Sequence, residues 1–177
     1  GKPVEQLAKN PRAMAIGERL FANTCSQCHG ADGRGSKSFP DLTDRDWLGS
    51  GQEGLDAYIH KTIVEGRRGV MPPMAAAVGN GDDTHNLAQY VLSLSGSPHN
   101  ELSAQLGKPK FSACAACHGV DGKGNAAIGA PNLTDKIWLH GWGEPAILAM
   151  VNGGKTNVMP PQAQRLTPEQ VEVLTAY

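Results

Sequence analysis

Aromatic side chains are scarce in this sequence, where Phe, Trp and Tyr make up only 5% of 177 residues. Glycine and proline are abundant instead, with 22 and 12 copies. A half-chain of roughly 90 residues with so few large side chains fills an apolar core poorly, and small domains of this kind usually need disulfides, a metal or a bound group. We therefore expect a large apolar cofactor.

The sequence also lacks the features of several other protein classes. Its formal net charge is −1, so the chain has no excess of positive charge that would favour nucleic acid as a partner. No stretch approaches the run of about 20 apolar residues that crosses a bilayer. The first residues, from Gly1 to Glu5, do not resemble a signal peptide, so we expect a soluble fragment or a mature chain.

Four cysteines form two pairs, and each pair is followed at once by a histidine. The two sets are Cys25, Cys28 and His29, and Cys114, Cys117 and His118. C-x-x-C-H is the attachment motif of c-type haem. Its thiols can form thioethers to the two vinyl groups of one porphyrin, and its histidine can then bind iron through Nε2. Zinc sites and redox dithiols also use C-x-x-C pairs.

The chain contains one sequence unit twice. CSQCHGADGRG begins at Cys25 and CAACHGVDGKG at Cys114, and PDLTD at Pro40 matches PNLTD at Pro131. Each copy continues with Trp-Leu and then Val-Met-Pro-Pro, whose methionine follows the motif histidine by 42 residues in the first copy and by 41 in the second. Because a zinc site or a disulfide does not require such a methionine, the repeat favours haem in both copies.

The two Val-Met-Pro-Pro segments make Met71 and Met159 the candidate sixth ligands of iron. Methionine opposite histidine raises the reduction potential of haem, which suits electron transfer, and it leaves no open iron position for a substrate. We see no nucleophile–base set, phosphate loop or paired carboxylates, so we expect no catalysis by this chain alone. We assume that each methionine serves the haem of its own half, and an exchanged arrangement stays open.

Other methionines and histidines are weaker candidates because their positions do not recur. Met74 aligns with Gln162, Met150 lies on a predicted helix, and Met14 precedes the first motif. The remaining histidines are His60, His85, His99 and His140, of which His140 is the most interesting because it follows a repeated Trp-Leu.

The surroundings of each haem are also predicted. A ligating histidine usually donates its second ring N–H to a carbonyl or carboxylate. We expect the loops at Pro40 and Pro131 to supply that carbonyl. The indoles of Trp47 and Trp138 either donate to a haem propionate or pack in the core.

Hydrophobic periodicity predicts short helices at residues 11–24, 55–63 and 87–94, and a capped helix that begins at Thr167-Pro168. No segment predicts a strand, so we expect an all-α fold. The long loops at 30–54 and 119–143 would wrap the cofactor. A loop-forming stretch at Ser95–Pro98 divides the chain into predicted domains 1–97 and 98–177.

Each half, with C-x-x-C-H and a distal Met-Pro, resembles a class I cytochrome c domain, so we expect two such domains in tandem, each wrapped around a covalent haem. The whole chain resembles the dihaem subunit III of cbb3-type cytochrome c oxidases, most strongly in CAACHGVDGKG and in GAPNLTD from Gly129. The resemblance assigns one haem c to Cys25, Cys28, His29 and Met71, and a second haem c to Cys114, Cys117, His118 and Met159.

This resemblance implies a relay of electrons from a donor cytochrome c or a cytochrome bc complex to the monohaem and catalytic subunits of the oxidase. It also implies the periplasmic side of the bacterial inner membrane, with a membrane tether that is not among these residues. A free periplasmic dihaem shuttle is the alternative. A dihaem peroxidase needs one haem without a firm sixth ligand, which both methionines disfavour.

Overall fold

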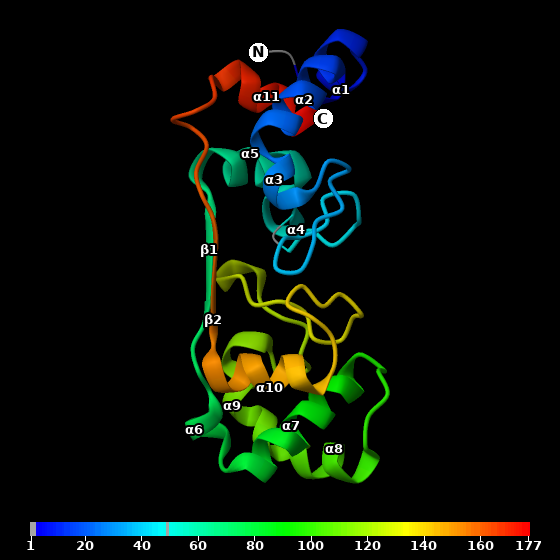
Figure 1. The fold of residues 1–177 in the computed structure, drawn as a ribbon, viewed down its shortest axis with the longest axis vertical. Coiled ribbons are helices and arrows are strands. Elements are labelled where there is room, and N and C mark those ends of the chain that lie inside the picture. The colour runs from blue at the N-terminus through cyan, green and yellow to red at the C-terminus, as the bar shows by residue number, and fades with distance from the viewer. Residues whose placement is uncertain (1–2, 49) are drawn as a thin grey trace. The chain divides into compact units, whose positions relative to one another are not determined.

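The computed structural model describes residues 3–48 and 50–177 and is mostly helical (Figure 1). The helices are α1 (Val4–Ala8), α2 (Pro11–Thr24), α3 (Ser26–His29), α4 (Ser50–Glu53), α5 (Leu55–Glu65), α6 (Ala75–Val78), α7 (Gly81–Leu94), α8 (Glu101–Gly107), α9 (Ser112–His118), α10 (Glu144–Gly153) and α11 (Pro168–Ala176). Two 3-10 turns, η1 (Lys108–Phe111) and η2 (Ala126–Ile128), complete the helical part. None of the described helices is long and apolar enough to span a membrane.

The predicted helices are confirmed. Asn10 caps α2 by accepting from the N–H groups of Arg12 and Ala13, and Pro11 occupies the first helical position. Thr167 caps α11 in a reciprocal box with Gln170. These local signals specify where the two helices begin.

The prediction of a fold without strands is wrong in one respect. The strands β1 (Arg67–Met71) and β2 (Lys155–Met159) pair in a two-stranded sheet. Each strand has only one β-branched apolar residue and is followed by two prolines, so the usual strand pattern of alternating apolar residues is absent. Pairing with the other copy of the repeat, rather than local propensity, makes these segments extended.

The chain forms two compact units. Unit 1 comprises Gly1–Arg68 and Val158–Tyr177, and unit 2 comprises Gly69–Asn157. This grouping differs from the division into 1–97 and 98–177 that the repeats predict. The chain leaves unit 1 through β1 and returns to it through β2, so each unit combines the first part of one repeat with the last part of the other.

In unit 1, α11 packs against α2 and α5. A Cβ at Gly17 on α2 would lie 2.8 Å from the Cβ of Tyr177, so the two helices approach closely at this glycine. The rings of Phe21 and Tyr177 lie 5.8 Å apart, centroid to centroid. This ring contact therefore joins a residue of the first repeat to a residue of the second within unit 1.

Unit 2 repeats the arrangement with α7, which packs against α8, α10 and η1. The rings of Tyr90 and Phe111 meet edge to face, with centroids 5.4 Å apart. Tyr90 belongs to the first repeat and Phe111 to the second. The aromatic pair thus joins the two repeats in unit 2 as it does in unit 1.

Candidate haem-binding sites

The first C-x-x-C-H motif lies at the end of α2 and along α3, in unit 1. Cys25 is half-buried, Cys28 is exposed and His29 is 8% exposed. The Nδ1 atom of His29 lies 3.1 Å from the carbonyl oxygen of Pro40. Because a carbonyl only accepts hydrogen bonds, Nδ1 carries the hydrogen and the lone pair is left on Nε2. The ring is therefore prepared to bind a metal through Nε2.

The second motif lies on α9, in unit 2, with the same geometry. His118 is 8% exposed, and its Nδ1 atom lies 3.0 Å from the carbonyl oxygen of Pro131. The prediction that the Pro40 and Pro131 loops supply these carbonyls is confirmed in both copies. The loop that follows each motif thus fixes the tautomer and the orientation of its histidine.

The four cysteines of the two motifs form no disulfide with one another. Burial raises the pKa of the Cys25 thiol, and the neighbouring Cys28 raises it further. Burial also raises the pKa of Cys114, and the neighbouring Cys117 raises it further. Each pair thus combines one shielded and one exposed cysteine.

The two candidate methionines lie at the ends of the paired strands. Met71 ends β1 and belongs to unit 2, whereas Met159 ends β2 and belongs to unit 1. After β1 the N–H of Met74 donates to the carbonyl of Val151 on α10, at 2.8 Å. After β2 the N–H of Gln162 donates to the carbonyl of Ile63 on α5, also at 2.8 Å. Each methionine segment is thus anchored on a helix of the other repeat.

Glycines at the ends of α5 and α10 permit this anchoring. Gly154 has φ +64°, and a Cβ there would lie 2.6 Å from the Met71 carbonyl oxygen and 2.8 Å from the Pro73 nitrogen. Gly66, with φ +71°, is crowded in the same way by the backbone of the segment after Met159. Positive φ and close backbone approach both require glycine here.

The compact units group the candidate site residues differently from the repeats. Unit 1 contains Cys25, Cys28, His29 and Met159, and unit 2 contains Cys114, Cys117, His118 and Met71. The assumption that each methionine serves its own half does not fit this grouping. Sequence reasoning could not decide the pairing because the two Val-Met-Pro-Pro segments are identical.

One of the two indoles of the repeat has an unsatisfied donor. Trp138 packs against the core of unit 2, and its Nε1 is buried with no acceptor among the described residues. The Nε1 of Trp47 donates to the carbonyl of Asp44 at 3.1 Å. A buried N–H without a partner costs free energy, and an anionic haem propionate would satisfy it. Unit 2 thus fits the haem that its motif predicts.

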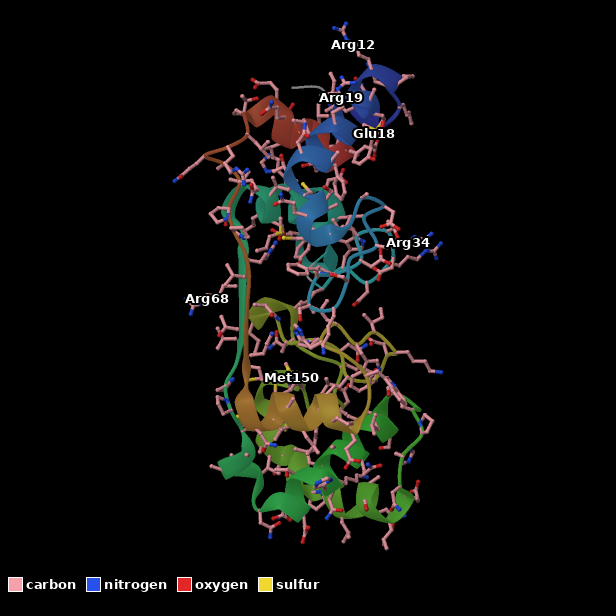
Figure 2. All side chains as sticks on the ribbon, in the orientation of Figure 1. Arg12, Glu18, Arg19, Arg34, Arg68 and Met150 are labelled. Atoms are coloured by element: carbon pink, nitrogen blue, oxygen red, sulfur yellow. The ribbon has the colours of Figure 1, made fainter. Side chains whose placement is uncertain are left out.

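Other candidate ligands are engaged elsewhere. His85 pairs with Glu144, with Nδ1 2.6 Å from Oε1, and His99 contacts the Ser97 carbonyl. Figure 2 shows Met150 on α10, where it is half-buried. Among the described residues no three His, Cys, Asp or Glu side chains gather into a metal cluster. The C-x-x-C-H motifs remain the sites that best fit an iron cofactor.

Comparison with known proteins supports the same assignment. The family model of cytochrome c oxidase, cbb3-type, subunit III matches residues 12–91 and again residues 110–177. The chain is 65% identical over 176 residues to the cbb3-type cytochrome c oxidase subunit CcoP of Rubrivivax gelatinosus, in a match that covers 99% of this chain and 57% of that protein.

Two further relatives are more distant. Subunit FixP of Azorhizobium caulinodans is 39% identical over 99% of this chain and 63% of its own length. Subunit CcoP of Cereibacter sphaeroides is 36% identical over 93% of this chain and 60% of its own length. The chain thus spans about three fifths of the curated relatives that it matches. The family model matches both repeats, and the relatives align with nearly the whole sequence. The chain therefore belongs to the cbb3-type cytochrome c oxidase subunit III family.

Proposed function

We propose that this chain carries electrons through two covalently bound c-type haems, as part of a cbb3-type cytochrome c oxidase. The observation that carries the proposal is the doubled C-x-x-C-H motif, in which each histidine has Nδ1 against a proline carbonyl and Nε2 left for iron. Membership of the subunit III family supports it. The haems supply reversible one-electron chemistry when bound, and the protein residues hold, orient and shield them.

The proposed ligand sets follow the compact units. Cys25 and Cys28 form the thioethers of the unit 1 haem, with His29 and Met159 as its axial ligands. The unit 2 haem takes its thioethers from Cys114 and Cys117, and its axial ligands are His118 and Met71. The exchange of methionines is supported by the anchoring of the segment after each one on a helix of the opposite repeat.

Filled axial positions make each site a carrier and not a centre of catalysis. Histidine and methionine together leave no iron position for a substrate, and the pair favours a high reduction potential. We therefore propose that the chain is not an enzyme by itself, and that oxygen is reduced elsewhere in the oxidase.

The partners and location are proposed from the relatives, which are named as oxidase subunits. We propose that electrons enter from a donor cytochrome c or a cytochrome bc complex and leave to the monohaem and catalytic subunits. The expected location is the periplasmic side of the bacterial inner membrane, with a membrane tether outside the described residues. No nucleic acid is expected as a partner.

The haem count tests this proposal. Purified protein, matured in a host that attaches c-type haem, should show two haems per chain in a pyridine haemochrome assay and in the mass of the denatured protein. Its reduced absorption spectrum should be that of low-spin haem c. A colourless protein with the mass of the bare polypeptide would contradict the proposal.

A further inference from the structure

Gln162 distinguishes the methionine segment of unit 1 from that of unit 2. It is the third residue after Met159 and is only 8% exposed. The equivalent residue in the other repeat is Met74, the third after Met71 and partly buried against the apolar core of unit 2. Both residues make the same backbone bond to a helix, so the difference between them lies in the side chain.

The backbone between Met159 and Gln162 has few means of being held in place. Pro160 and Pro161 have no N–H, so after Met159 the first backbone donor is that of Gln162. This donor is already bound to Ile63 on α5. Any further hydrogen bond to the backbone of the segment must therefore be accepted by one of its carbonyls.

The side chain of Gln162 makes that bond. Its Nε2 donates to the carbonyl oxygen of Pro160 at 3.0 Å. Its own backbone carbonyl accepts from Arg165 at 2.9 Å and from Leu166 at 3.0 Å, which fixes the chain on the far side. Gln162 thus ties the residue next to Met159 to both α5 and the following turn. Met74 cannot form the equivalent bond because a thioether is not a donor.

Burial of this amide has a cost. Its Oε1 atom is buried and has no hydrogen-bond donor among the described residues. A buried acceptor without a partner is destabilising, and the apolar Met74 avoids this cost at the matching position. The polar residue is therefore not explained by packing alone, and its bond to Pro160 provides a reason for it.

We propose that Gln162 is a positioning residue that holds the Met159 thioether on the haem iron of unit 1. This inference rests on the proposed function, in which Met159 is an axial ligand. Its consequence is an inequality between the sites. The methionine of unit 1 is displaced by an added ligand less readily than the methionine of unit 2, because Met74 cannot donate the hydrogen bond that Gln162 gives to Pro160.

Displacement by imidazole measures this inequality in the oxidised dihaem protein. The loss of the methionine–iron charge-transfer absorption should occur in two phases, which Met71→Leu and Met159→Leu assign by removing one phase each. Gln162→Met, which copies the residue of the other repeat, should speed the unit 1 phase by about threefold to tenfold, as expected for one lost neutral hydrogen bond. The unit 2 phase should not change.

Met74→Gln is the reciprocal variant, and it should slow the unit 2 phase while the unit 1 phase keeps its rate. Unchanged rates in Gln162→Met would overturn the role of Gln162, whether or not Met159 is a ligand. Should Met159→Leu leave both phases intact, the ligand assignment itself fails and the inference fails with it. The two failures are thus separated by the leucine variant.

Discussion

The two units are built from equivalent parts but bury very different amounts of apolar side chain. Unit 2 contains one continuous cluster of buried residues: Val78, Leu87, Ala88, Val91, Leu92, Phe111, Cys114, Ile147 and Val151. The buried hydrophobic residues described in unit 1 are Ala13, Val171 and Leu174. Since apolar burial is the main favourable contribution to folding, unit 2 has a protein core and unit 1 depends more on its cofactor.

Much of the unit 2 cluster lies on α7, which contributes Leu87, Ala88, Val91 and Leu92. After Met71 the chain forms α6, α7 and α8, and α7 and α8 pack tightly on each other within unit 2. These helices, packed on α10 and η1 of the second repeat, account for the apolar core of unit 2.

Removal of each haem attachment site tests this comparison with the largest expected effect. Cys25→Ala with Cys28→Ala should remove one haem and unfold unit 1, whose own core is small. Cys114→Ala with Cys117→Ala should also remove one haem, yet leave α7 and α8 folded. Mass spectrometry counts the haems and hydrogen exchange locates the unfolding. Equal protection of both units in the two variants would contradict the comparison.

Substitution of the glycines beside the methionine segments should have the next largest effect. Gly154→Ala introduces a Cβ at positive φ against the backbone at Met71, and we expect a loss of about 1–3 kcal/mol in the stability of unit 2. Gly66→Ala should destabilise unit 1 instead. Thermal melts and hydrogen exchange measure both effects.

Gly153→Ala is the matched control for this pair, because Gly153 precedes Gly154 on α10 and a Cβ there meets no atom within 4 Å. It should leave the protein as stable or slightly more stable. A loss as large as that of Gly154→Ala would show that the helix end, and not the contact with the Met71 segment, is sensitive.

The two indoles should affect the reduction potentials unequally. Trp138→Phe removes the N–H donor that we assign to a haem propionate. Without this hydrogen bond the negative charge of the propionate is less well neutralised, and it stabilises the oxidised iron. We expect the potential of the unit 2 haem to fall by on the order of 20–60 mV. Trp47→Phe should cause a smaller change, because its N–H already donates to Asp44. Potentiometric titrations that show equal shifts would contradict the assignment.

The smallest predicted effect concerns the capping boxes of α7 and α11, since the α7 box includes the carboxylate of Asp83 and the α11 box is uncharged. A hydrogen bond from Lys110, followed by one from the Asn80 N–H, holds the pKa of Asp83 below its ordinary value of 3.8. Asp83 therefore contributes stability that is complete above this value and is lost as the pH falls through the lower, folded-state pKa. The cap of α11 uses Thr167 and Gln170, which do not titrate.

Denaturant melts across pH distinguish the two caps. Asp83→Asn should slightly destabilise unit 2 at pH 6, and the difference from the unmodified protein should shrink as the pH falls through the lowered pKa of Asp83. Thr167→Ala should destabilise unit 1 by about 1 kcal/mol at every pH. A pH-independent effect of Asp83→Asn would show that the charge of its carboxylate is not involved.

Local chemistry made much of this molecule predictable. The cap of α11, the helix at residues 11–24 and the proline carbonyls beside His29 and His118 all result from short stretches of sequence. The strands and the grouping of the repeats into units were not predictable in this way. Tyr90 and Tyr177 occupy the same position of the repeat, so the sequence does not show which of them Phe21 contacts, and the structure pairs Phe21 with Tyr177.

A single-haem protein distinguishes the proposed exchange of methionines from ligation within each repeat. In the Cys114→Ala, Cys117→Ala background, the remaining haem lies at His29. Met159→Leu should then abolish the methionine–iron charge-transfer absorption and lower the potential by on the order of 100 mV or more, while Met71→Leu should change neither. The opposite result, with Met71→Leu effective and Met159→Leu silent, would contradict the account.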